Sequence, residues 1–127
     1  MEPQAFILHK TVTEQDTAEQ VGSGSLPVLA TPVLIAWMEQ AACGCCAALL
    51  EEGMTSVGTE LSMRHTAASP VGMPVTVTAE LTAAEGRTLC FRVWAQDAAG
   101  AIGGGTHTRA VVRVERFMEK ANAKQKR

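Results

Sequence analysis

The amino-acid sequence predicts an α+β fold in which one long helix lies against a curved antiparallel sheet of five strands. The first observation behind this prediction is a continuous stretch of apolar and small residues at 32–50, which has the length of a long helix. The second is a series of segments that are rich in β-branched or alternating apolar residues and are separated by turn sequences. These predicted strands cover residues 5–13, 55–67, 75–84, 88–97 and 102–116.

The predicted helix has a clear beginning and end. Thr31 offers a hydroxyl at the N-cap position, Pro32 suits the first helical turn, and Gly53 is a natural stop. A helix of about 20 residues is about 30 Å long. Because it is apolar on almost all faces, it should be surrounded by protein rather than lie on a surface. We do not expect it to cross a membrane, since it contains Glu39 and Gln40 and lacks basic flanking residues.

The strands after the helix predict a sheet with one covered face. Along residues 75–81 the apolar side chains occupy alternate positions, and residues 89–95 repeat the pattern. We expect the four strands after the helix to follow one another as a meander, and residues 14–26 to form an irregular connection before it. An open antiparallel sheet has two free edges, and dimerisation is a common way to cover one of them.

Composition limits the classes of function. The 127 residues suit a single domain over 1–127, with a core at about 5–116 and a solvated tail at 117–127. A net charge of −2 gives no basic field of the kind that attracts nucleic acid. The N-terminus lacks a signal-peptide pattern, so we expect a cytoplasmic protein with reduced cysteines. Cys43 and Cys46 form a C-x-x-C pair without further ligands at zinc spacing, so we expect packing and no metal site.

Glu39 is the first candidate for chemistry, because a carboxylate within an apolar helix is costly unless something compensates it. One interpretation is a carboxylate with a shifted pKa in a functional cleft. The other is a side chain that reaches solvent, or that pairs with Arg64 or Arg109 for packing alone. The helix by itself does not decide between the two.

Two further candidates are His65 and Thr31. His65 lies in the more apolar row of its predicted strand, where a lone histidine is usually a core residue but a histidine beside Glu39 is a general acid–base pair. Thr31 has a simple role as the N-cap and an alternative role in binding an anion or a developing oxyanion. Thr31 and Glu39 are about 12 Å apart along a straight helix, so a site that uses both is elongated or shared between two chains.

A glycine triplet at residues 103–105 precedes Arg109 in the last predicted strand. The triplet does not match the spacing of nucleotide-binding loops, and it indicates a bulge or a close approach of two backbones. Arg109 is then a candidate ion-pair partner or anion ligand.

Four segments taken together resemble one known family. They are LATPVLIAWMEQAA, SVGTELSMRHTAASPVGMPVTVTAEL, GRTLCFRVWAQD and GGGTHTRAVV. With their ordered motifs ATP-x6-E, VGT-x5-H-x4-P-V-G and GTH-x-R-AVV, they are similar to the hotdog-fold thioesterases of the fluoroacetyl-CoA thioesterase-like family over about residues 26–114.

This resemblance implies more than the patterns do. It implies a hotdog fold, with a long central helix wrapped by a five-stranded antiparallel sheet, and a homodimer with sites at the subunit interface. It implies hydrolysis of a short-chain acyl-CoA to the free acid and CoA, with no cofactor other than CoA as part of the substrate. The catalytic set would be Thr31, Glu39 and His65. Gly58 and Arg109 would lie near the bound acyl group.

One segment departs from the family. The fluoroacetyl-specialised enzyme has bulky aromatic residues before the helix that form a hydrophobic lid, whereas residues 20–28 here read QVGSGSLPV. We therefore expect hydrolysis of small acyl groups in general, without selectivity for fluoroacetyl-CoA. Two alternatives are a non-catalytic module that binds acyl-CoA or a small acid, and a hotdog hydratase acting on an enoyl or hydroxyacyl thioester. The hydratase ranks lower because no segment pairs histidine with a nearby aspartate, as hydratases of this fold usually do.

Overall fold

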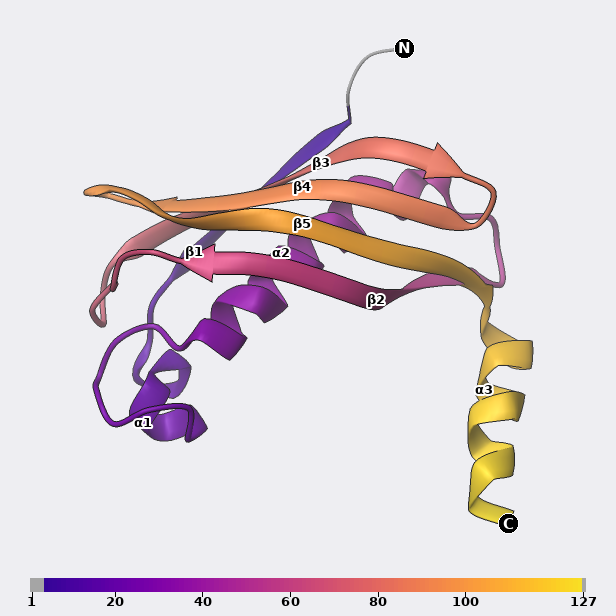
Figure 1. Ribbon diagram of the computed structural model, residues 1–127, viewed down its shortest axis with the longest axis horizontal. Coiled ribbons are helices and arrows are strands. Elements are labelled where there is room, and N and C mark those ends of the chain that lie inside the picture. The colour runs from indigo at the N-terminus through magenta and orange to yellow at the C-terminus, as the bar shows by residue number, and fades with distance from the viewer. Residues whose placement is uncertain (1–3, 127) are drawn as a thin grey trace.

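The computed structural model describes residues 4–126, which form one five-stranded sheet with a long helix against one face (Figure 1). The strands are β1 (Ala5–Thr11), β2 (Met54–His65), β3 (Pro74–Glu85), β4 (Thr88–Asp97) and β5 (Gly100–Arg113). Their order across the sheet is β1-β3-β4-β5-β2, and every neighbouring pair is antiparallel. The predicted α+β class and five-stranded antiparallel sheet are confirmed.

The predicted long helix is α2 (Thr31–Cys46), which continues into a 3-10 turn at Ala47–Leu49. It packs mainly against β1, β3 and β4. The stretch Thr31–Leu49 would also suit a membrane span by length and composition alone. In this structure the apolar residues of the helix form part of the hydrophobic core, because its buried side chains pack against the apolar side chains of the sheet. The buried helix residues are Leu34, Trp37, Met38, Ala41, Ala42, Cys45 and Cys46.

The alternating pattern predicted the covered face of the sheet correctly. Val75, Val77 and Ala79 of β3 are buried, while the residues between them are only partly covered. In β4 the same alternation buries every second residue from Leu89 to Ala95. These two strands therefore form much of the apolar sheet surface against which α2 packs.

The predicted meander is wrong for one strand. β3, β4 and β5 are consecutive neighbours, but β2 pairs with β5 rather than with β3. The connection at residues 66–73 is therefore no hairpin turn: it crosses the end of the sheet, where Thr66 donates its N–H to Ile102 and Ser69 bonds to Asp97. Alternation defines which face of a strand is buried but not which neighbour it has, because any antiparallel pairing keeps that face buried. The result leaves β1 and β2 at the two edges.

The glycine triplet allows a close approach of two backbones, as one of its two interpretations predicted. It lies in β5 opposite the end of β2. A methyl group on Gly103 would come within 2.6 Å of the carbonyl oxygen of Arg64, and one on Gly105 would collide with that of Ser62. Glycine is required here because side chains at these positions would push the two strands apart.

Both segments expected to be irregular contain helices. Residues 14–26 include a 3-10 turn (Glu14–Asp16) and the short helix α1 (Ala18–Val21). At the other end of the chain, the last strand ends at Arg113 rather than at residue 116, and α3 (Val114–Ala123) replaces most of the expected solvated tail. A 3-10 turn follows at Lys124–Lys126.

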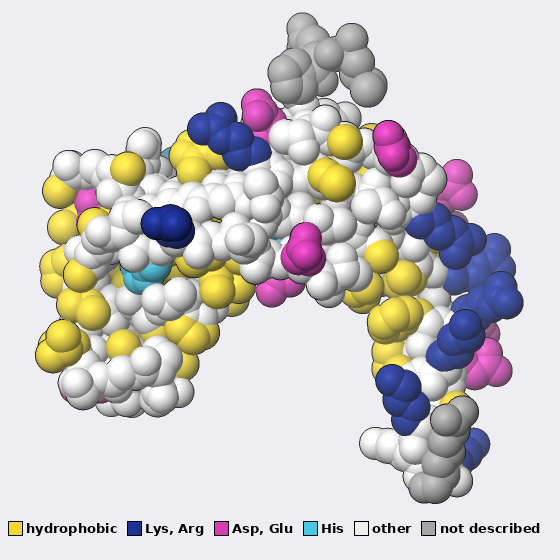
Figure 2. Space-filling model, viewed as in Figure 1, with side chains coloured by type: hydrophobic (Ala, Val, Ile, Leu, Met, Phe, Trp, Pro, Cys, Tyr) yellow, Lys and Arg dark blue, Asp and Glu magenta, His cyan; other side chains and the backbone are white. Residues whose placement is uncertain are grey.

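The sequence signal for α3 is an apolar spacing that continues past the strand. Val114, Phe117 and Met118 recur at helical intervals and form one partly exposed apolar face. Figure 1 shows α3 and the α1 segment extending to the same side of the sheet, and Figure 2 shows the open hollow between them. The predicted tail is therefore helical over most of its described part, and its residues are largely exposed.

Candidate active site

Thr31 and His65 are brought together by the tertiary structure. Thr31 is the first residue of α2, and His65 is the last residue of β2. The hydroxyl oxygen of Thr31 lies 2.7 Å from Nδ1 of His65. The predicted N-cap role of Thr31 is wrong, because the N-cap is Ala30 and no side chain caps the helix. The hydroxyl is instead free to share a proton with the imidazole.

His65 has the properties of a neutral base or proton carrier. Its side chain faces the helix, as the apolar row of β2 predicted, and burial lowers its pKa because the charged ring loses hydration. Its second ring nitrogen, Nε2, is buried and has no hydrogen-bond partner among residues 4–126. A pocket of about 300 Å³ opens beside the pair, lined by Thr31, His65 and parts of the segments 18–29 and 66–68.

Glu39 forms an ion pair with Arg109, at 3.2 Å between Oε2 and one terminal guanidinium nitrogen. The two sides of this pair differ in exposure: the Arg109 side chain is 7% exposed and that of Glu39 is 42% exposed. The carboxylate therefore has a counter-charge and still meets solvent, which explains how it is tolerated in an apolar helix. Arg109 is thus the ion-pair partner of Glu39, which is one of the two partners considered from the sequence. The ion pair leaves the carboxylate accessible to solvent.

Arg109 is held from several directions. Its Nε donates to the hydroxyl of Ser56 (2.8 Å) and a terminal nitrogen donates to the Ser56 carbonyl (3.0 Å). The nitrogen that contacts Glu39 also lies 3.1 Å from Nε2 of His107. A guanidinium has five N–H donors, so four of them are used by partners among residues 4–126 and one is left.

His107 completes this cluster through its own geometry. Its Nδ1 lies 2.8 Å from the carbonyl oxygen of Glu60, which can only accept a hydrogen bond. Nδ1 therefore carries the proton, and Nε2 is free to accept from Arg109. Burial lowers the pKa of His107, with the charge of Arg109 acting in the same direction, so the neutral ring is favoured. The ring also stacks on Phe91, which fixes its plane.

Gly58 is the point at which the backbone of β2 meets the Glu39 carboxylate. A methyl group placed on Gly58 would collide with Oε2 of Glu39 and would lie 3.3 Å from Arg109. The pairing of β2 with β5 is irregular just after this residue. Only glycine lets the acid lie directly against the strand.

The predicted site residues thus fall into two clusters within one chain. Thr31 and His65 form the first, and Glu39, Gly58 and Arg109 form the second. In the part of the chain that the structure describes, no hydrogen bond or ion pair joins Glu39 to His65. Both clusters lie along β2, an edge strand whose outer side has no neighbour in the sheet. Among the same residues, no three His, Cys, Asp or Glu side chains are grouped to hold a metal ion.

Comparison with known proteins identifies the family. The family described as FlK, fluoroacetyl-CoA-specific thioesterase, matches residues 12–115. The chain belongs to this family. A fluoroacetyl-CoA thioesterase of Streptantibioticus cattleyicolor is 43% identical over 116 residues, which are 91% of this chain and 84% of that protein.

Solved structures of the fluoroacetyl-CoA thioesterase FlK extend the likeness to the fold. One of them superposes with a TM-score of 0.92 at 39% identity, covering 98% of this chain and 97% of the other. A phenylalanine-to-alanine variant of FlK in complex with fluoroacetate and CoA has a TM-score of 0.87 at 39% identity, covering 92% of this chain and 99% of the other. The predicted resemblance and the hotdog fold are confirmed.

The five predicted site residues lie within the part of the chain that matches the FlK family. The same part contains Ser56 and His107, two residues of the Arg109 cluster that the sequence did not predict. A signal for His107 was present. It is two positions before Arg109 on one strand, so the two side chains share a face. Ser56 had no comparable signal, because its contact with Arg109 depends on the pairing of β2 with β5.

Proposed function

We propose that this protein hydrolyses a short-chain acyl-CoA to the free acid and CoA, at a site formed between two copies of the chain. Membership of the FlK family makes it a thioester hydrolase, and favours hydrolysis over a binding module or a hydratase. Its relative FlK is seen with fluoroacetate and CoA, which supports acyl-CoA as the substrate. The observation that supports a site shared between two chains is the separation of the two clusters within one chain.

Edge-to-edge pairing of two β2 strands would bring the clusters together. In an antiparallel pair related by a twofold axis, residues at equal distances from the axis lie opposite each other and on the same face. With the axis at Ser62, and with Thr59 unpaired as it is in the pairing of β2 with β5, His65 of one chain lies opposite Gly58 of its partner. The Thr31–His65 pair then faces the Glu39–Arg109 pair of the other subunit. The same contact would cover the free edge of the sheet.

The chemistry divides between the two clusters. The hydroxyl of Thr31 and the backbone amide of Gly58 would polarise the thioester carbonyl. Glu39, ion-paired with Arg109, and His65, whose pKa is lowered by burial, would share two tasks. One is attack on the thioester carbonyl: Glu39 either takes a proton from a water that attacks the carbon, or attacks it directly to form an acyl-enzyme anhydride that a water then hydrolyses to the free acid. The other is delivery of a proton to the departing CoA thiolate as the carbon–sulfur bond breaks.

Arg109 has a second possible task. The family resemblance implies a position for Arg109 near the acyl group, and its one unused N–H would be available to a polar acyl substituent. The remaining donors orient Glu39. A substituent that accepts a hydrogen bond would therefore be recognised without breaking the ion pair.

The segment before α2 supports a preference for small acyl groups without fluoroacetyl selectivity. Residues 20–28 carry no aromatic side chain, and their largest apolar residue, Leu26, is 63% exposed. A comparison of kcat/KM for acetyl-, propionyl- and fluoroacetyl-CoA tests this, with similar values expected for all three. A preference of a hundredfold or more for fluoroacetyl-CoA would overturn it.

Mixed dimers test the shared site directly. His65→Ala and Glu39→Gln chains with different affinity tags are co-expressed, and dimers that carry both tags are purified. A site shared between chains leaves one of the two sites complete in each mixed dimer, so about half of the wild-type activity is expected. Dimers with the same substitution in both chains are the matched control and should be inactive. Inactive mixed dimers would place each complete site within one chain.

A further inference from the structure

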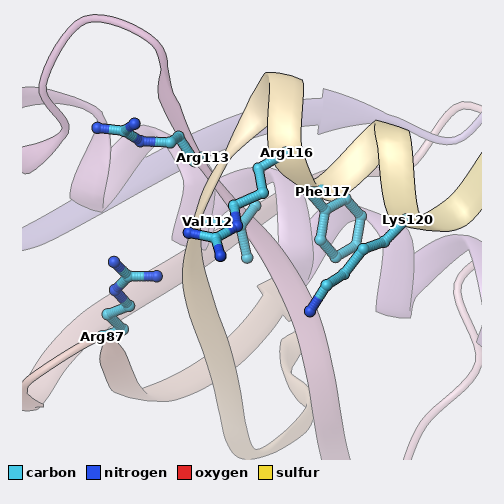
Figure 3. Close-up of a pocket in the computed structure, with 6 residues that line it drawn as sticks. All are labelled: Arg87, Val112, Arg113, Arg116, Phe117 and Lys120. Atoms are coloured by element: carbon cyan, nitrogen blue, oxygen red, sulfur yellow. The ribbon is translucent and has the colours of Figure 1, made fainter.

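A second concave surface lies at the junction of β5 and α3, away from the Thr31–His65 pair. It encloses about 370 Å³. Its lining residues are Arg87, Val112, Arg113, Arg116, Phe117 and Lys120 (Figure 3). We infer that this basic pocket binds the adenosine phosphates of the acyl-CoA substrate. The inference rests on the proposed function, because it assigns a further part of the same substrate to a separate surface.

The charge of the basic pocket is the first argument. Four of its lining residues are cationic, although the chain as a whole has a net charge of −2. The ion pair of Glu39 is the one found among residues 4–126, so none of these four cations has a carboxylate within 4.0 Å there. Cations gathered without a counter-charge repel one another and attract a polyanion. The 3′-phosphate and diphosphate of CoA supply several negative charges.

The arrangement of the side chains is the second argument. In Figure 3 the head groups of Arg87 and Arg116 turn toward each other over Val112, while Lys120 extends beside the ring of Phe117. Guanidinium groups bind phosphate through paired hydrogen bonds, and an ammonium group serves as a point charge. The Phe117 ring is 40% exposed and offers a flat apolar surface on which a purine can stack.

The position of the pocket relative to the acyl site is the third argument. Arg109 of the acyl cluster and Arg113 of the pocket are both in β5, four residues and about 13 Å apart along the strand. The phosphopantetheine arm that joins the thioester of CoA to its adenosine phosphates is longer than this when extended. A substrate whose acyl group lies at Gly58 can therefore place its nucleotide at the end of the same strand.

A truncated substrate distinguishes the effect of this pocket on binding from the effect of the catalytic groups on hydrolysis. Acetyl-pantetheine has the same thioester as acetyl-CoA but lacks the nucleotide. For the double variant Arg116→Ala/Lys120→Ala we expect the KM for acetyl-CoA to rise about tenfold or more with kcat unchanged, because charge-assisted hydrogen bonds to phosphate are lost. The KM for acetyl-pantetheine should not change. Equal effects on both substrates, or no effect on either, would overturn the inference.

Two controls complete the experiment. Lys124→Ala removes a positive charge from the adjoining 3-10 turn, outside the pocket, and should leave both KM values as in the wild type. Titration calorimetry with adenosine 3′,5′-bisphosphate should show binding to the wild type and to Lys124→Ala, and at least tenfold weaker binding to the double variant. Calorimetry needs no turnover, so it tests the pocket even for a protein that hydrolyses neither substrate. Absence of wild-type binding would contradict the assignment.

Discussion

Thr31 and His65 are 34 positions apart in the chain, yet the hydroxyl of one lies 2.7 Å from the imidazole of the other. The contact joins the beginning of α2 to the end of β2. It replaces the N-cap hydrogen bond that a threonine at this place would ordinarily make, since the helix starts one residue earlier than such a cap requires. A hydroxyl released from capping and paired with an imidazole is a site feature rather than a helix-stabilising one.

Thr31→Ala should therefore lower activity much more than stability. Loss of a group that polarises the carbonyl costs about 10²–10³ in kcat. The free energy of unfolding should change by less than about 1 kcal/mol, because the exposed hydroxyl caps no helix. Thioester hydrolysis and urea denaturation of the same preparations measure the two effects. Thr31→Ser is the matched control and should keep most of the activity; a stability loss equal to that of a lost N-cap would contradict this role.

Glu39→Gln should abolish most hydrolysis and leave the fold intact. The amide still accepts a hydrogen bond from Arg109, whose other bonds to Ser56 and His107 remain. What is lost is the negative charge, so kcat for acetyl-CoA should fall about 10²–10⁴-fold. Circular dichroism and size-exclusion chromatography check fold and oligomeric state. Turnover close to the wild type in this variant would remove Glu39 from the chemistry.

Gly58→Ala should reduce activity by displacing the acid. The added methyl group would collide with Oε2 of Glu39, so the carboxylate must turn away from the strand and from Arg109. We expect a loss in kcat of about a hundredfold, which is typical when a catalytic group is misplaced by an ångström. Gln96→Ala, at an exposed position of β4, is the control and should behave as the wild type. Unchanged kcat in Gly58→Ala would show that the position of Glu39 is not critical.

His107 should make the stability of the protein depend on pH. Burial, with help from the charge of Arg109, lowers its pKa below the ordinary value of 6.5, while Glu39 and the Glu60 carbonyl oppose the shift. Between the two pKa values the unfolded chain binds more protons than the folded one. The free energy of unfolding therefore rises with pH through this window. The contribution of His107 to stability is complete above about pH 6.5 and decreases as the pH falls below that value.

The measurement is urea denaturation at a series of pH values from 7.5 down to 5, compared with His107→Gln. The buried His65 also has a lowered pKa and contributes to the same slope. His107→Gln should thus flatten the dependence in part, and the further change His65→Gln should remove most of what remains. An unaltered slope in His107→Gln would mean that its ring is not held neutral.

Local patterns determined much of this fold. Three features could be predicted from the sequence: the apolar stretch that forms α2, the alternation along β3 and β4, and the close approach at the glycine triplet of β5. Each depends only on which face of one element is buried, or on how closely that element approaches a neighbour. The candidate residues Thr31, Glu39 and His65 stood out for a similar reason. Glu39 and His65 are polar groups in otherwise apolar rows, where only a partner or a function compensates them, and Thr31 offers a hydroxyl at the beginning of the helix.

Tertiary structure decided which of those groups meet. The pairing of β2 with β5 places Ser56 against Arg109, and the crossing of residues 66–73 releases β2 to the edge of the sheet. No residue pattern specifies such neighbours, because strand pairing depends on the whole path of the chain and not on the composition of one strand. The sequence by itself therefore named the candidate site residues and the family that the chain resembles. Only the folded chain decided the partner of each group, because the path of β2 brings His65 to Thr31 and its pairing with β5 brings Arg109 to Glu39.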